Sequence, residues 1–372
     1  MKLSCSMKIL AVNCGSSSIK YKLYETKHNN LLAKGLIEKI GETGSSIKDH
    51  TQGIQKLLND ILESKAISSL DEIAAIGHRV VHGAETFQKP HRIDEQVIKK
   101  IEECARLAPL HNPANLAGIL GCTKHLPRVP QVAVFDTAFH HTMPAYAYTY
   151  AIPIDYYKKY QVRKYGFHGT SHQFIAQQAS KMLKKPLRKI KLITCHLGNG
   201  CSITAIDRGK SMDTSMGFTP LEGLMMGTRC GDIDVAAVFH IMTKEGLSVE
   251  QMDTILNKKS GFLGVSGLSN DFRVIEDAMK KGNQLAKLAY SIFLYRLKKY
   301  IGAYYFILGG VDAVCFTGGI GEHGKSIVAS VKKDLKRAYG NKVRSLVIST
   351  DEELLIAHLT QATVLKSAEQ RE

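Results

Sequence analysis

The fold is decided near the start of the chain by "KILAVNCGSSSIKYKLYE", residues 8–25. An apolar run leads into a Gly/Ser cluster, and a stretch that alternates between apolar and polar residues follows it. Such alternation is typical of strands with one buried face, and Gly/Ser clusters between strands are typical of turns. The stretch therefore predicts two strands, 8–12 and 19–25, joined by a tight turn.

A second strand–turn–strand unit is found in "KIKLITCHLGNGCSITAIDRGK", residues 189–210. Further on, "FTGGIGE" (316–322) follows a predicted strand and opens a predicted helix, where backbone N–H groups favour phosphate. Two similar units, each followed by helices and strands, indicate a duplicated α/β architecture with a cleft between its halves. The boundary is expected at 145–160, where the alternation of strands and helices is interrupted.

Between these units the chain alternates between the spacing of helices and that of buried strands. Helices are predicted at 53–67 and at 94–110, the second one ending at Pro109. Strands are predicted at 73–83 and 129–140, the latter opening into a loop at Asp136.

The composition is that of a globular protein, with 44% hydrophobic and 23% charged residues among 372. No apolar run is long enough to cross a bilayer, and the start lacks the long apolar region of a signal peptide. The eight cysteines include no CxxC pair, which favours free thiols over a disulfide framework or a zinc site. We expect a cytoplasmic protein without a membrane partner.

The formal net charge of +16 makes nucleic acid the first partner to consider. The lysines are spread over the predicted wet faces of helices, as in 180–191, 278–287 and 330–337, and no known reader motif accompanies them. A basic balance also raises the local concentration of small anionic substrates. We therefore expect anionic substrates and no nucleic-acid partner.

Taken singly, the polar motifs leave structural alternatives open. "NCGSSSIK" is either a plain hairpin turn or an anion cradle, with Gly15 allowing close approach and Lys20 adding charge. Arg79 and Arg229 lie among glycines and small polar residues and could reach into a cleft, although most arginines are solvated. His168 could be a buried structural histidine. No histidine spacing predicts zinc.

Nine motifs in order along the chain resemble the signature set of the acetate kinase (acetokinase) family. They run from residue 8 to about 356 and read "NCGSSSIKYKLYE", "GHRVVHGAE", "LAPLHNPANL", "VFDTAFHHTMP", "YGFHGTSH", "HLGNGCSI", "MDTSMGFTPLEGLMMGTRCGDID", "SNDFR" and "FTGGIGEH". The resemblance implies an α/β fold, the duplicated two-domain actin-like ATPase (ribonuclease H-like) fold of the sugar-kinase/actin/heat-shock-protein-70 superfold, with an interdomain active-site cleft. It places the first domain at 1–150, rejoined by 353–372, and the second at 151–352.

The resemblance also implies roles for individual residues. Asp136, His168 and Arg229 resemble the catalytic residues of the family, and Asn13 and Glu352 its magnesium ligands.

Binding roles follow from the same motifs. Arg79 resembles the arginine for the substrate carboxylate, and the pocket for the methyl group would be formed by Val81, Leu110, Phe167 and Pro220. The residues expected on the phosphates are Ser16, Ser18, Lys20, His196, Leu197, Gly198, Asn199 and Gly200. The residues expected on the base and ribose are Asp271, Phe272, Arg273, Gly319, Ile320, Gly321, Glu322 and His323.

The implied reaction is reversible, Mg²⁺-dependent, in-line transfer of the ATP γ-phosphate to acetate, giving acetyl phosphate and ADP. The resemblance also implies that Mn²⁺ can replace Mg²⁺ and that the enzyme is a homodimer formed through the second domain. A simple carboxyl group is already ionised near pH 7, so acetate needs no general base. Asp136 is therefore expected to orient an arginine or a metal-bound water.

Departures from the family pattern leave some alternatives open. Ala84 stands where a second glycine is expected, and the segment between Gly324 and Glu352 is short, which bears on ATP against other triphosphates or pyrophosphate as donor. A sister enzyme for propionate or butyrate is the near alternative, because one methylene changes discrimination by only ~1–3 kcal/mol. A non-catalytic regulator of the same superfold is the far one. The intact set of polar site residues argues against it.

Overall fold

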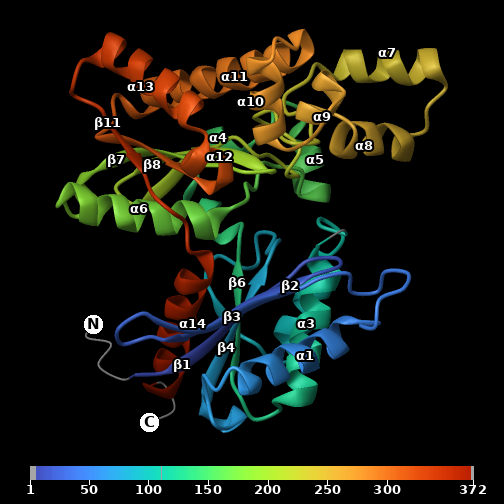
Figure 1. The fold of residues 1–372 in the computed structure, drawn as a ribbon, viewed down its shortest axis with the longest axis vertical. Helices are drawn as coiled ribbons and strands as arrows, with labels where there is room; N and C mark the ends of the chain where they lie inside the picture. Colours follow the sequence, from blue (N-terminus) through green and yellow to red (C-terminus); the bar gives the residue numbers. More distant parts are fainter. Residues whose placement is uncertain (1–5, 110, 370–372) are drawn as a thin grey trace. The chain divides into compact units, whose positions relative to one another are not determined.

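The structure is a computed structural model that describes residues 6–109 and 111–369. The chain divides into two compact units (Figure 1). The first unit takes in 1–141 and 351–372, and the second takes in 142–350. The first boundary between the units thus lies between residues 141 and 142. The sequence had led us to expect it slightly later, at 145–160.

The first unit contains a six-stranded sheet with the order β3-β2-β1-β4-β6-β5. Its strands are β1 (Lys8–Cys14), β2 (Ile19–Glu25), β3 (Asn30–Ile37), β4 (Ile73–Val80), β5 (His91–Arg92) and β6 (Gln131–Phe135). Strand β1 pairs antiparallel with β2 and parallel with β4, which in turn pairs parallel with β6. The predicted hairpin is confirmed, and its first strand continues beyond the predicted end to Cys14.

Helices cover both faces of this sheet. On one face α1 (His50–Glu63) and α3 (Asn112–His125) pack together against it, and on the other lies α14 (Glu352–Glu369) (Figure 1). Helix α14 approaches the backbone of β4 so closely that a Cβ on Gly77 would lie 2.2 Å from Thr360 Oγ1. The last helix of the chain is therefore fitted directly onto a strand from its first quarter.

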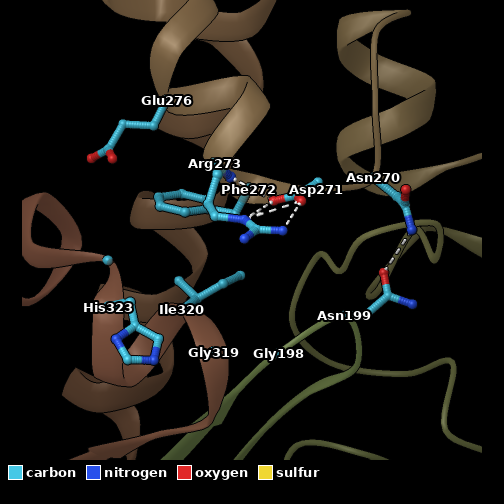
Figure 2. A pocket seen from close by; sticks show the side chains of 11 residues that line it. Gly198, Asn199, Asn270, Asp271, Phe272, Arg273, Glu276, Gly319, Ile320 and His323 are labelled. Carbon is cyan, nitrogen blue, oxygen red and sulfur yellow. Dashed lines mark hydrogen bonds and ion pairs between the residues drawn. The ribbon is translucent and has the colours of Figure 1, made fainter.

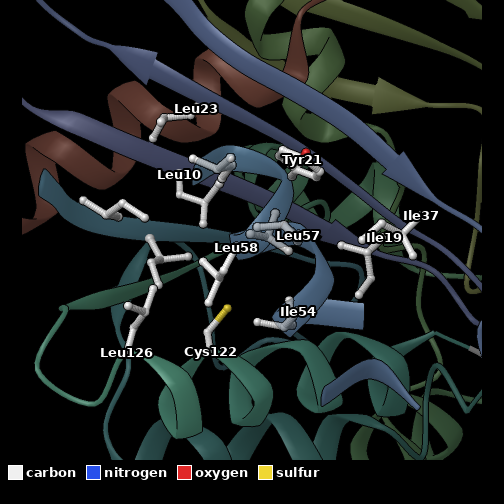
Figure 3. Packing of buried hydrophobic residues seen from close by; sticks show 14 of the residues in the cluster. Leu10, Ile19, Tyr21, Leu23, Ile37, Ile54, Leu57, Leu58, Cys122 and Leu126 are labelled. Carbon is white, nitrogen blue, oxygen red and sulfur yellow. The ribbon is translucent and has the colours of Figure 1, made fainter. Parts of the chain in front are cut away.

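The core of the first unit lies between the hairpin and α1. Figure 3 shows Leu10 and Leu23 of the strands facing Leu57 and Leu58 of the helix, and each is at most 1% exposed. Burying each such side chain stabilises the fold by roughly 1.5–3 kcal/mol. Helix α1 begins where the side chain of Asp49 accepts a hydrogen bond from the N–H of Gln52.

One predicted element was wrong at its C-terminal end. Helix α2 (Glu95–Cys104) stops well before Pro109, although apolar residues continue beyond it. The following backbone closes in tight turns, with Leu107 N donating to Cys104 O and Ala108 N to Ala105 O. The proline disfavours helical geometry at the residue before it, so these apolar residues pack from a turn.

The second unit repeats the sheet. Its order is β11-β10-β7-β8-β9, formed by β7 (Lys191–Leu197), β8 (Cys201–Asp207), β9 (Lys210–Thr214), β10 (Ala313–Thr317) and β11 (Arg344–Val347). Strand β7 pairs antiparallel with β8 and parallel with β10, as β1 does with β2 and β4. The predicted duplication is confirmed: β9-β8-β7-β10-β11 repeats the order β3-β2-β1-β4-β6, while β5 has no counterpart among the described strands of the second sheet.

Two long helices cover the second sheet. Helix α6 (Gly169–Leu183) packs against β7 and β10, and α11 (Gln284–Leu308) packs against β7 and β8 from the other face (Figure 1). The remaining helices of this unit are α4 (Ala145–Tyr148), α5 (Ile154–Tyr160), α7 (Val235–Glu245), α8 (Val249–Lys258), α9 (Gly261–Ser266), α10 (Phe272–Lys280), α12 (Gly318–His323) and α13 (Lys325–Tyr339). Short 3₁₀ helices occupy Leu70–Glu72, Ala138–Thr142 and Leu187–Lys189.

Two further features concern the apolar character of the helices and the state of the cysteines. Within 6–109 and 111–369, no helix has the length and apolar character needed to span a bilayer. The cysteines described by the structure are free thiols, and they are Cys14, Cys104, Cys122, Cys195, Cys201, Cys230 and Cys315.

Two buried histidines predict how the stability of the first unit depends on pH. Burial lowers the pKa of His78 and of His82 to about 4. The unfolded chain takes up these protons near pH 6.5, so stability is lost as the pH falls from about 6.5 toward 4. Each histidine is expected to cost about 2 kcal/mol of unfolding free energy between pH 7.5 and 4.5.

Urea unfolding of His78→Gln checks this prediction. The glutamine can keep the hydrogen bond to Gln131 but does not titrate. We expect a smaller loss of stability on acidification than in the wild type, while exposed His28→Gln behaves like the wild type. An acid loss as large in His78→Gln as in the wild type would contradict the prediction.

Candidate active site

A cluster around Arg79 lies at one edge of the first sheet. Arg79 Nε donates to Asp136 Oδ1 at 3.1 Å, Nη2 donates to Asp136 Oδ2, and Nη1 donates to Asn13 Oδ1 at 3.2 Å. The three residues come from β4, the segment after β6, and β1, which are neighbouring parallel strands. The carboxyl ends of parallel strands meet at one edge, so residues distant in sequence gather there.

Electrostatics keep the Arg79 guanidinium charged. Burial alone would lower its pKa, but the carboxylates of Asp136, Glu352 and Glu353 outweigh this and raise it above the ordinary value. Asp136 is fully buried and bound by both arms of the guanidinium. The Asp136 carboxylate therefore fixes the orientation of the Arg79 guanidinium.

The oxygens near Arg79 fit a hard cation that takes few protein ligands. Asn13 supplies an amide oxygen and Glu352, at the start of α14, a carboxylate that acts on Arg79. No group of three or more His, Cys, Asp or Glu residues in the described chain forms a metal cluster. Mg²⁺ is commonly held by one or two protein oxygens with waters and substrate phosphates, so the donor set suits it.

The turn of the first hairpin is closed by a hydrogen bond from Gly15 N to Ser18 O at 2.8 Å. Ser16 is exposed on this turn, and Ser18 is partly exposed. Lys20 Nζ lies 2.8 Å from Glu353 Oε1, which is buried in the first turn of α14. The charge of Lys20, expected at a phosphate, is thus paired with a carboxylate of its own unit.

In the second unit, the side chains of His168 and Arg229 lie close to the glycine turn between β7 and β8. A Cβ on Gly200 would lie 3.4 Å from His168 Cε1 and 3.5 Å from Arg229 Nη1. The ring of His168 also lies against that of His196, with centroids 4.3 Å apart. The turn brings its backbone close to His168 and Arg229 because Gly200 has no side chain.

Hydrogen bonds from α6 and β8 fix the histidine. His168 has φ +56° and directly precedes α6, and its Nδ1 lies 2.9 Å from Ser202 Oγ. His172, one turn further along the helix, lies 2.7 Å from both Ser202 Oγ and Thr194 Oγ1. The other edge of the His168 ring is thereby aimed toward Gly200.

Arg229 contacts a backbone carbonyl and a thioether sulfur. Its Nη1 donates to Pro220 O at 3.4 Å and lies 3.8 Å from Met226 Sδ, and no carboxylate of the described residues pairs with it. Burial lowers its pKa from the ordinary value, which for an arginine still leaves it charged. A partly buried cation that no carboxylate of the described chain neutralises favours an anionic ligand.

A pocket of about 400 Å³ lies beside the same glycine turn (Figure 2). Asn270 Nδ2 donates to Asn199 Oδ1 at 3.1 Å and joins the turn to the segment before α10. Arg273 folds back on Asp271, with Nη2 2.6 Å from Oδ2. The pocket is lined by Gly198, Asn199, Asn270, Asp271, Phe272, Arg273, Glu276, Gly319, Ile320, His323 and Gly324.

The pocket contains most of the predicted base and ribose residues but not Gly321 and Glu322. The carboxylate of Glu322 accepts hydrogen bonds from Gly318 N and Thr350 N, at 3.1 and 3.4 Å. It therefore occupies the start of α12, where the sequence led us to expect affinity for phosphate.

Three lining residues were missed from the sequence: Asn270, Glu276 and Gly324. Asn270 lies inside the quoted motif "SNDFR", and Glu276 follows Arg273 by three residues on α10, so helical spacing could have found it.

The residues expected around the methyl group are divided between the units. Val81 belongs to the first unit, and Phe167 and Pro220 belong to the second. Val81 and Phe167 are buried, whereas Pro220 is partly exposed. Leu110 lies outside the described residues.

The duplicated sheets, the glycine turns and an arginine without a carboxylate partner among the described residues are typical of a phosphotransferase of the two-domain actin-like ATPase fold. The sequence model of the acetokinase family matches residues 8–365. The chain is 50% identical to the acetate kinase of Halothermothrix orenii, over 96% of this chain and all of the relative. The crystal structure of Porphyromonas gingivalis acetate kinase matches with a TM-score of 0.92 and 44% identity, over 96% of this chain and all of that one.

A propionate kinase from Francisella tularensis is also similar, with a TM-score of 0.88 and 42% identity over 96% of this chain and 99% of that one. The chain belongs to the acetokinase family, and it is an enzyme of acetate phosphorylation with ATP and ADP as co-substrates.

The close approach at Gly200 gives a prediction. In Gly200→Ala the added methyl would touch His168 and Arg229 and take up space at the turn. We expect kcat to fall about 10-fold or more, since misplacement near the reacting groups is costly. Chemical denaturation should show little change, because the new contacts are of ordinary van der Waals length.

Gly302→Ala on α11 is the matched control, because nothing lies within 4 Å of the added methyl. It should keep full activity and gain up to about 1 kcal/mol of stability, as alanine replaces glycine inside a helix. An unchanged kcat in Gly200→Ala would show that this turn is not close to the reaction.

Proposed function

We propose that the enzyme transfers the γ-phosphate of ATP directly and reversibly, by in-line displacement, to the carboxylate of acetate. The observation that carries the proposal is the charged Arg229, which lies with His168 at a glycine turn and has no carboxylate partner within the described chain. Phosphoryl transfer spreads negative charge over the equatorial oxygens, so catalysis is mainly positioning and charge stabilisation.

The acceptor needs binding rather than activation. Arg79, fixed in a bidentate pair with Asp136, is proposed to hold the acetate carboxylate. Asp136 keeps the guanidinium in place and removes no proton, because acetate is ionised near pH 7. The methyl group is proposed to contact Val81, Leu110, Phe167 and Pro220.

Two groups are proposed to stabilise the transferring phosphoryl group. Arg229 supplies a full charge, and His168 donates from the ring edge that faces Gly200 while Ser202 holds the other nitrogen. An arginine in such a role is worth on the order of 10³-fold in kcat. Asp136, His168 and Arg229 are thus proposed as the catalytic set.

The nucleotide is proposed to bind in the pocket beside the second glycine turn. Base and ribose would contact Asp271, Phe272, Arg273, Gly319, Ile320 and His323. Gly321 and Glu322, expected at the same site, do not line this pocket. The phosphates would contact Ser16, Ser18, Lys20 and the turn residues His196, Leu197, Gly198, Asn199 and Gly200. Asn13 and Glu352 would hold Mg²⁺ or Mn²⁺, which when bound neutralises phosphate charge.

Propionate is the second candidate acceptor. It is favoured by the likeness to the Francisella tularensis propionate kinase. A pocket for one methyl group discriminates against one more methylene by only ~1–3 kcal/mol, so some activity on propionate is expected.

A hydroxamate assay of acyl-phosphate formation tests the proposal, with acetate, propionate and butyrate each offered ATP or pyrophosphate. Acetate with ATP should form acyl phosphate. The kinase proposal fails if no pair of acceptor and donor does so.

Substitution of the two site arginines, Arg79 and Arg229, is expected to change different kinetic constants in this assay. Arg229→Ala should mainly lower kcat, by about 10³-fold, because its charge is needed in the transition state. Arg79→Ala should also raise the KM for acetate, because it removes the partner of the carboxylate. Arg188→Ala, in the 3₁₀ helix before β7, is a control of the same type and should be neutral. Wild-type turnover in both site variants would refute their assignment.

We also propose a cytoplasmic homodimer formed through the second unit. Helix α7 carries Val235 and Phe239, both 60% exposed, and Ile241, and none of its residues is buried. Exposed Ile233 and Tyr295 extend this apolar surface in sequence and onto α11. Several exposed apolar side chains on one unit support an interface, and the free thiols support a reducing compartment.

Phe239→Asp should convert the dimer to a monomer in analytical ultracentrifugation, because it introduces a charge into the proposed interface. Leu31→Asp on β3 of the first unit, 44% exposed, should leave the dimer intact. A Phe239→Asp protein that sediments like the wild type would place the interface elsewhere.

A further inference from the structure

We propose that Asp232 and Tyr300 are positioning residues that act on the reaction through Arg229. The inference rests on the role proposed above for Arg229. Neither residue lies at the glycine turn itself, and the argument for them comes from the loop that carries Arg229.

The loop is closed at its neck by a reciprocal pair of hydrogen bonds. Gly223 N donates to Asp232 Oδ1 at 2.8 Å, and Asp232 N donates to Gly223 O at 2.9 Å. Gly231 has φ +69°, and a Cβ there would lie 2.4 Å from Gly223 O. The Asp232 carboxylate therefore fixes both ends of residues 223–232 relative to one another.

The guanidinium of Arg229 contacts one residue of this loop and one residue just before it. Arg229 O accepts from Met226 N at 3.1 Å, while Nη1 contacts Met226 Sδ and Pro220 O. With no carboxylate among the described residues to hold the charge, the guanidinium is placed by the backbone that carries it. A displacement of Gly223 or Asp232 would therefore also displace the guanidinium of Arg229.

Helix α11 anchors the neck from outside. Tyr300 OH donates to Asp232 Oδ2 at 2.8 Å, and Arg296 Nη1 donates to Cys230 O at 2.7 Å. Burial and then the Asp232 carboxylate raise the pKa of Tyr300 above its ordinary value, so the hydroxyl keeps its proton. Both oxygens of Asp232 are committed, one to the loop and one to the helix.

The anchor is separate from the nucleotide pocket. Asp232, Arg296 and Tyr300 line a different hollow, which they share with Tyr295 on the same helix. None of the three lines the pocket beside the glycine turn. Loss of the anchor should therefore lower kcat more than it changes the KM for ATP.

Tyr300→Phe is the main test, because it removes one hydroxyl and keeps the ring. We expect kcat to fall about 10-fold, as for a small displacement of a charge near the reacting group, with the KM for ATP changed less than about 3-fold. Tyr146→Phe, on a side chain 85% exposed in the same unit, is the matched control and should keep wild-type kcat. Asp232→Asn, which keeps an oxygen for Gly223 N, should lose less than Asp232→Ala.

A double-mutant cycle with Arg229→Ala decides whether the effect passes through the arginine. In the Arg229→Ala background, Tyr300→Phe should cost no further kcat. An equal loss in both backgrounds, or full activity of Tyr300→Phe in the wild type, would overturn the inference while leaving the role of Arg229 intact. Full activity of Arg229→Ala itself would overturn both.

Discussion

The arrangement of the first unit depends on the ion pair between Arg79 and Asp136. This pair keeps a full positive charge at the carboxyl ends of the strands of an apolar sheet. A partly buried guanidinium is costly unless its hydrogen bonds are met, and here carboxylate and amide oxygens meet them. Those oxygens come from β1 and the end of β6, so the pair needs the order of the strands. The fold and the charge therefore support each other.

The second unit uses the same sheet for a different electrostatic arrangement. Its arginine, Arg229, lies on a loop and has no acidic partner among the described residues, while Arg79 is held by a carboxylate. Arg79 is thus neutralised by a carboxylate of the protein, whereas the charge of Arg229 is available to a ligand. This difference suits an enzyme that must hold one anion in place and stabilise charge that develops on another.

The hairpins and the duplication of the sheets could be predicted from the sequence because they depend on residues that are close together in the chain. Residues 8–25 and 189–210 contain the strands and turns that form each hairpin, so the duplication was evident from alternation and glycines. The pairing of Lys20 with Glu353 was not, because it joins residues from opposite ends of the chain through α14. The premature end of α2 was missed because the apolar spacing continues through turns that only the backbone reveals.

The fit of α14 against β4 has a consequence for the order of events during synthesis. Gly77 leaves room for Thr360 and Ile356, and no other described helix covers β1, β4 and β6 on that face. The growing chain must therefore be synthesised as far as α14 before this face of its first sheet is covered. Until then an apolar surface of the nascent protein stays open to water, and the entire second unit is translated in that interval.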